Sequence, residues 1–351
     1  CWKKFDFLQK YRDGFKSSEL GRIYEQLPLK ELAEKIRGLM PVKNPQGKKP
    51  MFPLEGEIAL MFLKPYTGMS DDGLVEMLNG NIHMQIFCGV LIDPDNPLKD
   101  GKIVSAIRNR LAVYLDIKSL QKILYDKWKS QLENKDMMLT DATCYESLLR
   151  YPTDVKLLWE CCEWLHSLLS DKCRLTGESK PRTKYHEIDK ARLSYAKQRK
   201  PRKSETKKLR RRLLHLLERL LKEWTRLNKI TGGLIRLSAE QNKRVRACHM
   251  VLDQQRRLFN GEKIDHRIVS IDRPYIRPIV RGKENKRVEF GAKVNNIQID
   301  GISFIEHHSF EAFNEGIRLK ESIEYHKELT GIDAKRVGAD TIEFTSIKSL
   351  C

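Results

Sequence analysis

The chain has 351 residues, enough for two or three domains with a full buried core. Charged residues make up 32% and hydrophobic residues 40%, and no apolar run reaches the roughly 18 residues of a membrane helix, which argues against a membrane protein. The net charge of +19 favours DNA or RNA as partner over an anionic membrane, since no amphipathic terminal helix is visible. Without a visible signal peptide or a CxxC pair among its eight cysteines, we expect a cytoplasmic protein with ordinary reduced thiols.

The first 50 residues are predicted to form a helical lead-in followed by a linker. Apolar residues recur at helical spacing between Leu20 and Leu39. The stretch Pro41–Pro50 is predicted to be a linker, because its prolines and Gly47 are incompatible with a helix.

Residues 51–135 are predicted to form a compact helical domain. The expected helices cover 54–63, 71–80, 82–90, 102–115 and 117–133, with Pro65 ending the first and Ser70 capping the second. Short helices with tight turns suit a helix-turn-helix-like DNA reader and a plain helical bundle equally well. In a DNA reader, Arg108, Asn109 and Arg110 are the candidates for base contacts, and both arginines are expected to be exposed.

A carboxylate follows the next predicted element directly. Met137, Met138 and Leu139 are expected to form a buried strand, and Asp141 comes immediately after it. A rigid strand fixes the position of a carboxylate oxygen, the kind of ligand that Mg²⁺ prefers. Taken alone, an acid at this position is more often a turn residue or a helix cap. A helix capped by Thr153 is predicted to follow.

The region from Trp159 to Glu262 is predicted to be almost entirely helical, with leucines every three or four residues. Residues 172–222 hold 19 lysines and arginines against five acids, an excess that indicates contact with DNA phosphates, the alternative being a solvated helix face. We expect Lys197–Lys208 to be a loop that DNA orders. The candidate phosphate contacts here are Lys197, Arg199, Lys200, Arg202, Lys203, Lys207, Lys208 and Arg210.

Strands are predicted to resume at 264–270 and 276–280. From Val288 to Asn295 apolar and polar residues alternate, and Asp300-Gly301 is a strong hairpin signal. A helix at 314–329 and a strand at 334–339 follow, with Asp340 at the end of that strand. This order is the one needed to bring Asp141 and Asp340 side by side at the carboxyl ends of neighbouring strands.

Three stretches carry a resemblance to a known family: LTDATCYESLLRYPTDVKLLWE around Asp141, the segment Arg273–Lys320, and AKRVGAD ending at Asp340. Together they resemble bacterial insertion-sequence transposases of the DDE type, of the insertion-sequence-five kind, over roughly residues 1–342. The resemblance implies an α+β protein. A helical N-terminal domain, which recognises the element's ends, would precede a ribonuclease H-like catalytic domain at 136–351 with a basic helical insertion at about 160–262.

The chemistry implied by the resemblance is cleavage and rejoining of DNA by two Mg²⁺ ions held by two Asp and one Glu. Asp141 and Asp340 match the two aspartates. Lys293 and Arg281 are candidates to hold phosphate near the metals, the alternative being an exposed strand lysine and a turn arginine. Bringing two element ends together would require a homodimer on DNA, in the bacterial cytoplasm at the nucleoid.

The resemblance ends at Glu343, and no residue of the chain matches the family's catalytic Glu, which lies on a later helix. We therefore expect a C-terminally truncated transposase in which the last part of the catalytic fold is missing and catalysis is lost. The alternative is a non-catalytic basic DNA-binding protein.

Overall fold

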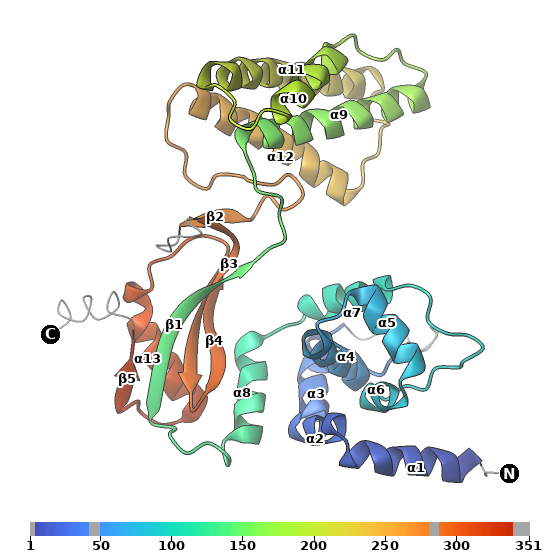
Figure 1. Cartoon of the computed structure of the whole chain (residues 1–351), viewed down its shortest axis with the longest axis vertical. Coiled ribbons are helices and arrows are strands. Elements are labelled where there is room, and N and C mark those ends of the chain that lie inside the picture. The colour runs from blue at the N-terminus through green and yellow to red at the C-terminus, as the bar shows by residue number, and fades with distance from the viewer. Residues whose placement is uncertain (1–3, 42–49, 281–287, 340–351) are drawn as a thin grey trace. The chain divides into compact units, whose positions relative to one another are not determined.

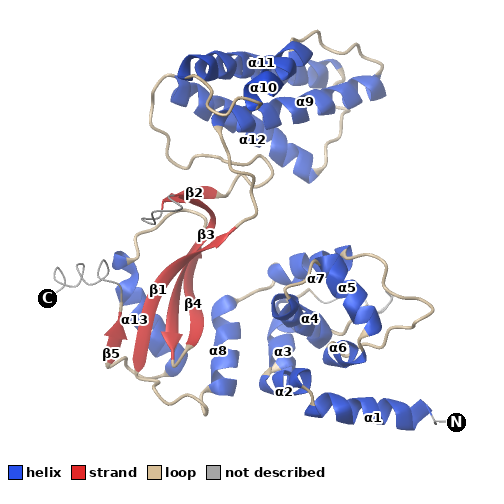
Figure 2. Cartoon of the chain, in the orientation of Figure 1, coloured by secondary structure: helices blue, strands red, loops and turns tan. Residues whose placement is uncertain are grey.

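The computed structural model describes residues 4–41, 50–280 and 288–339 (Figure 1). Helices predominate and a mixed sheet accompanies them, which confirms the predicted α+β class (Figure 2). The chain divides into two compact units: residues 1–141, 296–306 and 316–351, and residues 142–295 and 307–315. Asp340, Arg281, Glu343 and most of the predicted Pro41–Pro50 linker lie outside the described residues.

The first unit opens with a series of short helices. They are α1 (Lys4–Ser17), α2 (Glu19–Gln26), α3 (Leu29–Leu39), α4 (Leu54–Thr67), α5 (Asp71–Gly80), α6 (Ile82–Phe87), α7 (Lys102–Ala112) and α8 (Ile117–Trp128). Ser70 caps α5 as predicted, since its hydroxyl accepts a hydrogen bond from the Gly73 amide at 3.0 Å. One core of apolar side chains between Phe15 and Leu111 joins α3–α7.

Helix α4 corrects one predicted boundary. Pro65 was expected to end the helix, but the helix runs to Thr67 and closes at Gly68, which has a φ of 64°. A proline removes one backbone donor and disturbs the preceding turn. Because Pro65 lies in the last turn, the eleven helical residues before it have already formed the helix, and the glycine provides the left-handed closure.

The sheet consists of β1 (Met137–Glu146), β2 (Arg277–Val280), β3 (Val288–Ile299), β4 (Ile302–Ser309) and β5 (Arg336–Gly338). The order is β2-β3-β1-β5, with β4 paired to β3. β1 and β5 are parallel, whereas β2 and β3 are antiparallel. The predicted hairpin is confirmed between β3 and β4, where Asp300 and Gly301 both have positive φ, 48° and 87°.

Two strand predictions were wrong. Residues 264–270 form no strand, because their apolar side chains Ile268 and Val269 are buried without an alternating pattern. β1 is longer than predicted and continues through the polar residues after Leu139 to Glu146. Asp141 therefore lies inside the strand and not at its end.

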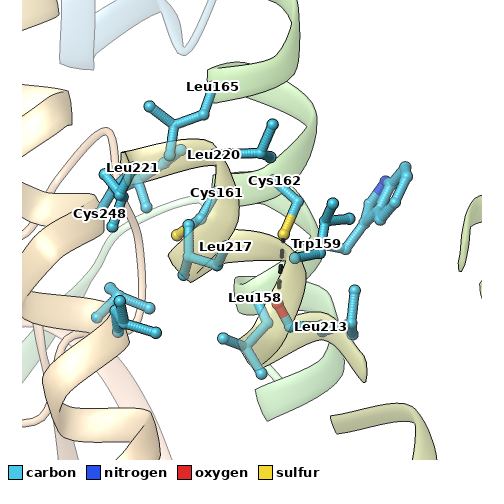
Figure 3. Packing of buried hydrophobic residues seen from close by; sticks show 14 of the residues in the cluster. Leu158, Trp159, Cys161, Cys162, Leu165, Leu213, Leu217, Leu220, Leu221 and Cys248 are labelled. Atoms are coloured by element: carbon cyan, nitrogen blue, oxygen red, sulfur yellow. Dashed lines mark hydrogen bonds between the residues drawn. The ribbon is translucent and has the colours of Figure 1, made fainter. Parts of the chain in front are cut away.

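Four helices of the second unit form a bundle: α9 (Asp154–Thr176), α10 (Tyr185–Ala196), α11 (Lys203–Ile230) and α12 (Ala239–Phe259) (Figure 1). The predicted leucine face of α11 is buried in it. Figure 3 shows Cys161, Cys162 and Cys248 inside this core, where the Cys162 thiol contacts the Leu213 carbonyl oxygen at 3.7 Å. Burial raises the pKa of Cys161 and Cys162 well above the usual range, so both are neutral packing residues.

A separate core in the first unit holds α8 and α13 (Leu319–Thr330) against sheet residues such as Met138, Ile297 and Phe304. A short 3₁₀ turn, Gly316–Arg318, leads into α13, and Gly331 closes it at a φ of 76°. The Gln121 side chain of α8 accepts from the Ile305 amide at 2.6 Å and donates to the Ile305 carbonyl oxygen at 2.9 Å. The glutamine therefore satisfies backbone groups of β4 that would otherwise need another strand.

Candidate functional site

Strand β1 presents Asp141 to solvent. Along the strand Met138, Thr140 and Ala142 are buried while Leu139 and Asp141 are exposed, because successive side chains point to opposite faces. Within the described part of the chain, no hydrogen bond or ion pair engages the Asp141 carboxylate. An exposed carboxylate on a rigid strand without a protein partner is available to a ligand.

Strand β5, the parallel neighbour of β1, ends at Gly338, opposite Leu139 and close to Asp141 along β1. β5 pairs with β1 in the register Met137 opposite Arg336, Met138 opposite Val337 and Leu139 opposite Gly338. The backbone oxygen of Asp136 accepts from the Lys335 and Arg336 amides at 2.9 and 3.2 Å, which fixes this register at its start. Asp141 lies two residues beyond the last described pair, and Asp340 lies two residues beyond it on the other strand, outside the described residues.

The described residues contain one of the two predicted metal-binding acids. Among them, no group of three or more His, Cys, Asp or Glu side chains is placed to hold a metal ion. Glu146 ends β1 and is exposed, five residues after Asp141. A carboxylate such as Asp141 nevertheless suits Mg²⁺, which keeps several waters and is commonly held by one or two protein carboxylates.

A second candidate feature is the basic segment Lys197–Lys208 between α10 and α11. It was expected to be a loop, but only 197–202 lies outside a helix, and Lys203–Lys208 form the first turns of α11. Glu205 in the first turn favours the helix, because a negative charge is stabilised at a helix N-terminus. The predicted phosphate contacts in this segment are all exposed, and no acid among the described residues pairs with them. They are Lys197, Arg199, Lys200, Arg202, Lys203, Lys207 and Lys208.

Arg210 differs from the rest of this set. It is half-buried and pairs with Asp154 at 3.2 Å, and the same carboxylate also binds Arg267 and accepts from the Gln255 side chain at 3.1 Å. Asp154 is the first residue of α9, so the arginines tie α11 and residue 267 to that helix N-terminus. Arg210 therefore links α11 to the start of α9, and unlike the other candidates its charge is neutralised by an acid.

Lys293 is also engaged within the protein. The sequence suggests a phosphate contact or an exposed strand lysine, but Lys293 is buried on β3. Its ammonium pairs with Glu315 at 2.6 Å and donates to the Phe313 carbonyl oxygen at 2.8 Å. The polar side of β3 is therefore covered, and the lysine neutralises a nearby acid.

The predicted base-reading arginines of α7 have different environments. Arg108 is exposed, as expected, and pairs with Asp71 at 2.8 Å. Arg110 is half-buried and pairs with Glu57 of α4, whose own side chain is 5% exposed, so the expectation that Arg110 is exposed was wrong. Asn109 is exposed.

The structure also contains a pocket that the sequence does not predict. It has a volume of about 540 Å³ and lies in the second unit between the start of α9, the end of α10 and the segment that follows α10. Trp159, Glu160, Glu163 and Arg192 contribute to its lining. The sequence does show that Glu160 and Glu163 share one face of a helix, because they are three residues apart. It does not indicate that α10 folds over that face and closes a pocket.

Comparison with known proteins gives a match over the helical N-terminal region. Residues 9–110, which include α2–α6 and most of α7, match the family described as Transposase domain (DUF772), and this match supports a transposase. No curated protein and no solved structure matches the chain significantly. None of the described helices is long and apolar enough to cross a membrane.

Proposed function

We propose that the chain is a DDE-type DNA transposase in which Asp141 and Asp340 are the paired catalytic aspartates. The observation that carries the proposal is the parallel register of β1 and β5, which ends at Leu139 opposite Gly338. If that register continues by two residues, Asp340 comes to lie beside Asp141 on the same face, since side chains two apart on a strand share a face. The mixed sheet, with its parallel β1–β5 pair and its β3–β4 hairpin, supports a ribonuclease H-like arrangement.

In this proposal Asp141 and Asp340 would hold Mg²⁺. The ions, when bound, would activate the attacking oxygen and stabilise the leaving oxygen of a phosphodiester. The protein's own contribution is positional: β1 fixes Asp141, and the Asp136 backbone fixes the start of β5 relative to it. The exposed side of Asp141 gives a phosphodiester access to the site.

The metal proposal is tested by Mn²⁺ binding, followed by electron paramagnetic resonance of the free ion. Asp141→Asn should weaken Mn²⁺ binding by about tenfold or more, because it removes one charged ligand and keeps the side-chain volume. Glu146→Gln on the same strand is the matched control and should leave binding unchanged. Equal Mn²⁺ binding by all three proteins would show that Asp141 is not a metal ligand.

The basic segment Lys197–Lys208 is the proposed phosphate-binding surface. Its cations are exposed and unpaired in the described structure, whereas other arginines of the bundle, such as Arg212 and Arg219, are neutralised by Glu187 and Glu223. A run of unneutralised charge in a protein of net charge +19 attracts a polyanion and releases its counterions. Phosphate contacts of this kind position DNA without reading its sequence.

The alternative function is a non-catalytic DNA-binding protein. It is favoured by the unpaired basic segment, which can bind DNA phosphates without a metal site. The two functions differ in the Mn²⁺ experiment: a non-catalytic binder would retain salt-sensitive DNA binding and show no Asp141-dependent metal binding.

A further inference from the structure

The pocket between α9 and α10 adjoins the basic segment. Gln198 and Pro201, which alternate with Lys197, Arg199 and Lys200 along the chain, form part of its wall. The Tyr195 hydroxyl, also in the pocket lining, is within hydrogen-bonding distance of the Thr206 hydroxyl, at 3.0 Å. This contact links the end of α10 to the first turn of α11, so the pocket wall and the basic segment are held as one structure.

The pocket offers a flat cation and aromatic surfaces. The Arg192 guanidinium lies 4.5 Å from the centre of the Trp159 ring and pairs with Asp189 at 2.6 Å. These two contacts fix the guanidinium plane in the pocket wall. Nucleobases stack on guanidinium planes and on aromatic rings, and a volume of about 540 Å³ lies within the range of small-ligand sites.

The floor of the pocket carries two carboxylates without partners. Glu160 and Glu163 lie three residues apart on α9 and therefore on one helical face. In the described structure neither makes an ion pair or a hydrogen bond, although Glu160 is only partly exposed. Burial raises the pKa of Glu160, and Arg150, also in the pocket lining, opposes that rise. Glu160 is half-buried and Glu163 is exposed, and a half-buried carboxylate without hydrogen-bond donors favours a ligand that brings N–H groups.

We infer that this pocket binds one unpaired guanine of a DNA strand whose phosphates lie on Lys197–Lys203. Guanine presents two adjacent N–H donors on its Watson–Crick edge, which match a carboxylate, whereas thymine presents one N–H between two carbonyl oxygens that a carboxylate repels. Arg192 supplies the stacking surface, and Arg150 and Lys156 supply cations for the flanking phosphate. This inference rests on the proposed DNA binding by the basic segment, and it adds a base-specific site to a surface that otherwise reads only phosphates.

The test is a fluorescence-anisotropy titration with short labelled duplexes that carry a single-nucleotide bulge. The bulge is guanine, thymine or an abasic site, and a fully paired duplex serves as reference. The wild-type chain should bind the guanine bulge about tenfold more tightly than the thymine or abasic bulge. Glu160→Gln and Glu163→Gln should each reduce this ratio to about threefold or less.

Glu240→Gln is the matched control, since Glu240 is exposed on α12 of the same bundle and does not line the pocket. Each of the three variants loses one negative charge, so general affinity for DNA rises equally and the guanine-to-thymine ratio isolates the pocket. Thermal unfolding verifies that all variants fold.

Two results would overturn the inference while the proposed phosphate surface stands. The first is equal, salt-dependent binding of all the duplexes by the wild-type chain. The second is a guanine preference that persists in both Glu variants. Absence of binding to any duplex would overturn the proposed DNA surface together with the pocket.

Discussion

Several ionisable side chains inside the fold have partners from elements far apart in the sequence. Glu57 of α4 pairs with Arg110 of α7, Asp154 holds two arginines, and the buried His326 ring nitrogen Nε2 lies 2.9 Å from the Lys135 carbonyl oxygen. Asp141 and Glu160 differ from these, because no described residue pairs with either. Substitution of the first group should therefore reduce stability, and substitution of the second should reduce ligand binding.

Replacement of Arg110 tests the stabilising role of its ion pair. Arg110→Ala leaves Glu57 buried without its cation and should reduce the free energy of unfolding by about 3 kcal/mol, at the low end for a broken buried pair because Arg110 is one-third exposed. Arg108→Ala removes the more exposed partner of Asp71 and should cost no more than about 1 kcal/mol. Urea unfolding measures both. Equal losses of unfolding free energy in Arg110→Ala and Arg108→Ala would contradict the stabilising role of the Arg110–Glu57 pair.

His326 gives stability a pH dependence. Burial lowers the pKa of this histidine from its ordinary 6.5. The ring is therefore neutral in the folded state at pH values where the unfolded state already takes up a proton. The contribution of His326 to the stability of the fold is complete above about pH 6.5 and is lost as the pH falls below that value. His326→Gln should reduce the difference in Tm between pH 7.5 and pH 5.5, measured by calorimetry. The exposed His249→Gln should leave that difference unchanged, and an unaltered difference in His326→Gln would refute the linkage.

At the scale of elements, the helices were predictable because capping residues and apolar spacing act locally. The predicted Ser70 and Thr153 caps are present, and the leucine face of α11 is buried. Strand β1 was predicted too short, because its polar residues 140–146 are held in the sheet by pairing that the local pattern does not show. The first turns of α11 were missed because their lysines look like a loop in composition, whereas Glu205 at the helix start acts by its position.

The close approach of β1 and β3 depends on Gly291. A Cβ at this position would lie 2.0 Å from the Tyr145 carbonyl oxygen, so the backbone of one strand would have to move. Gly291→Ala should therefore destabilise the second unit by about 3 kcal/mol in urea unfolding. Gly38→Ala in α3 is the control: open space surrounds that position, and it should stabilise by about 0.5–1 kcal/mol. A neutral Gly291→Ala would show that the two backbones are farther apart than described.

At the scale of the whole molecule, the charge excess was predictable and its distribution was not. The sequence places 19 basic residues in 172–222, but it does not show which of them are neutralised. Arg210 and Arg212 pair with acids of other helices, and Arg219 pairs with Glu223 one turn along α11, whereas the cations of Lys197–Lys208 pair with no acid in the described structure. The candidate site was partly predictable for the same reason: Asp141 was found from its strand, whereas the pocket on α9 depends on packing between helices.

The salt dependence of DNA binding tests the basic segment. Replacing Lys197, Lys200 and Lys203 together by Gln should lower the slope of log K against log salt by about 2–3, since each lost phosphate contact contributes about 0.9. Replacing Lys229, Lys243 and Arg246 by Gln changes the net charge equally at exposed sites of the same bundle outside the segment. That control should lower the slope by less than about 1. Equal changes in slope would indicate a diffuse charge effect and not a defined surface.

The central proposal, that Asp141 and Asp340 are two ligands of one metal site, is tested most directly by cleavage of the backbone with Fe²⁺ in place of Mg²⁺. Added hydrogen peroxide is reduced by the bound Fe²⁺ to hydroxyl radicals, which cut the chain locally, and mass spectrometry maps the cuts. The account predicts cuts at 139–142 and at 336–341 in the same sample, both suppressed by excess Mg²⁺ and by Asp141→Asn. Cuts in only one of the two segments, or cuts that persist unchanged in Asp141→Asn, would contradict it.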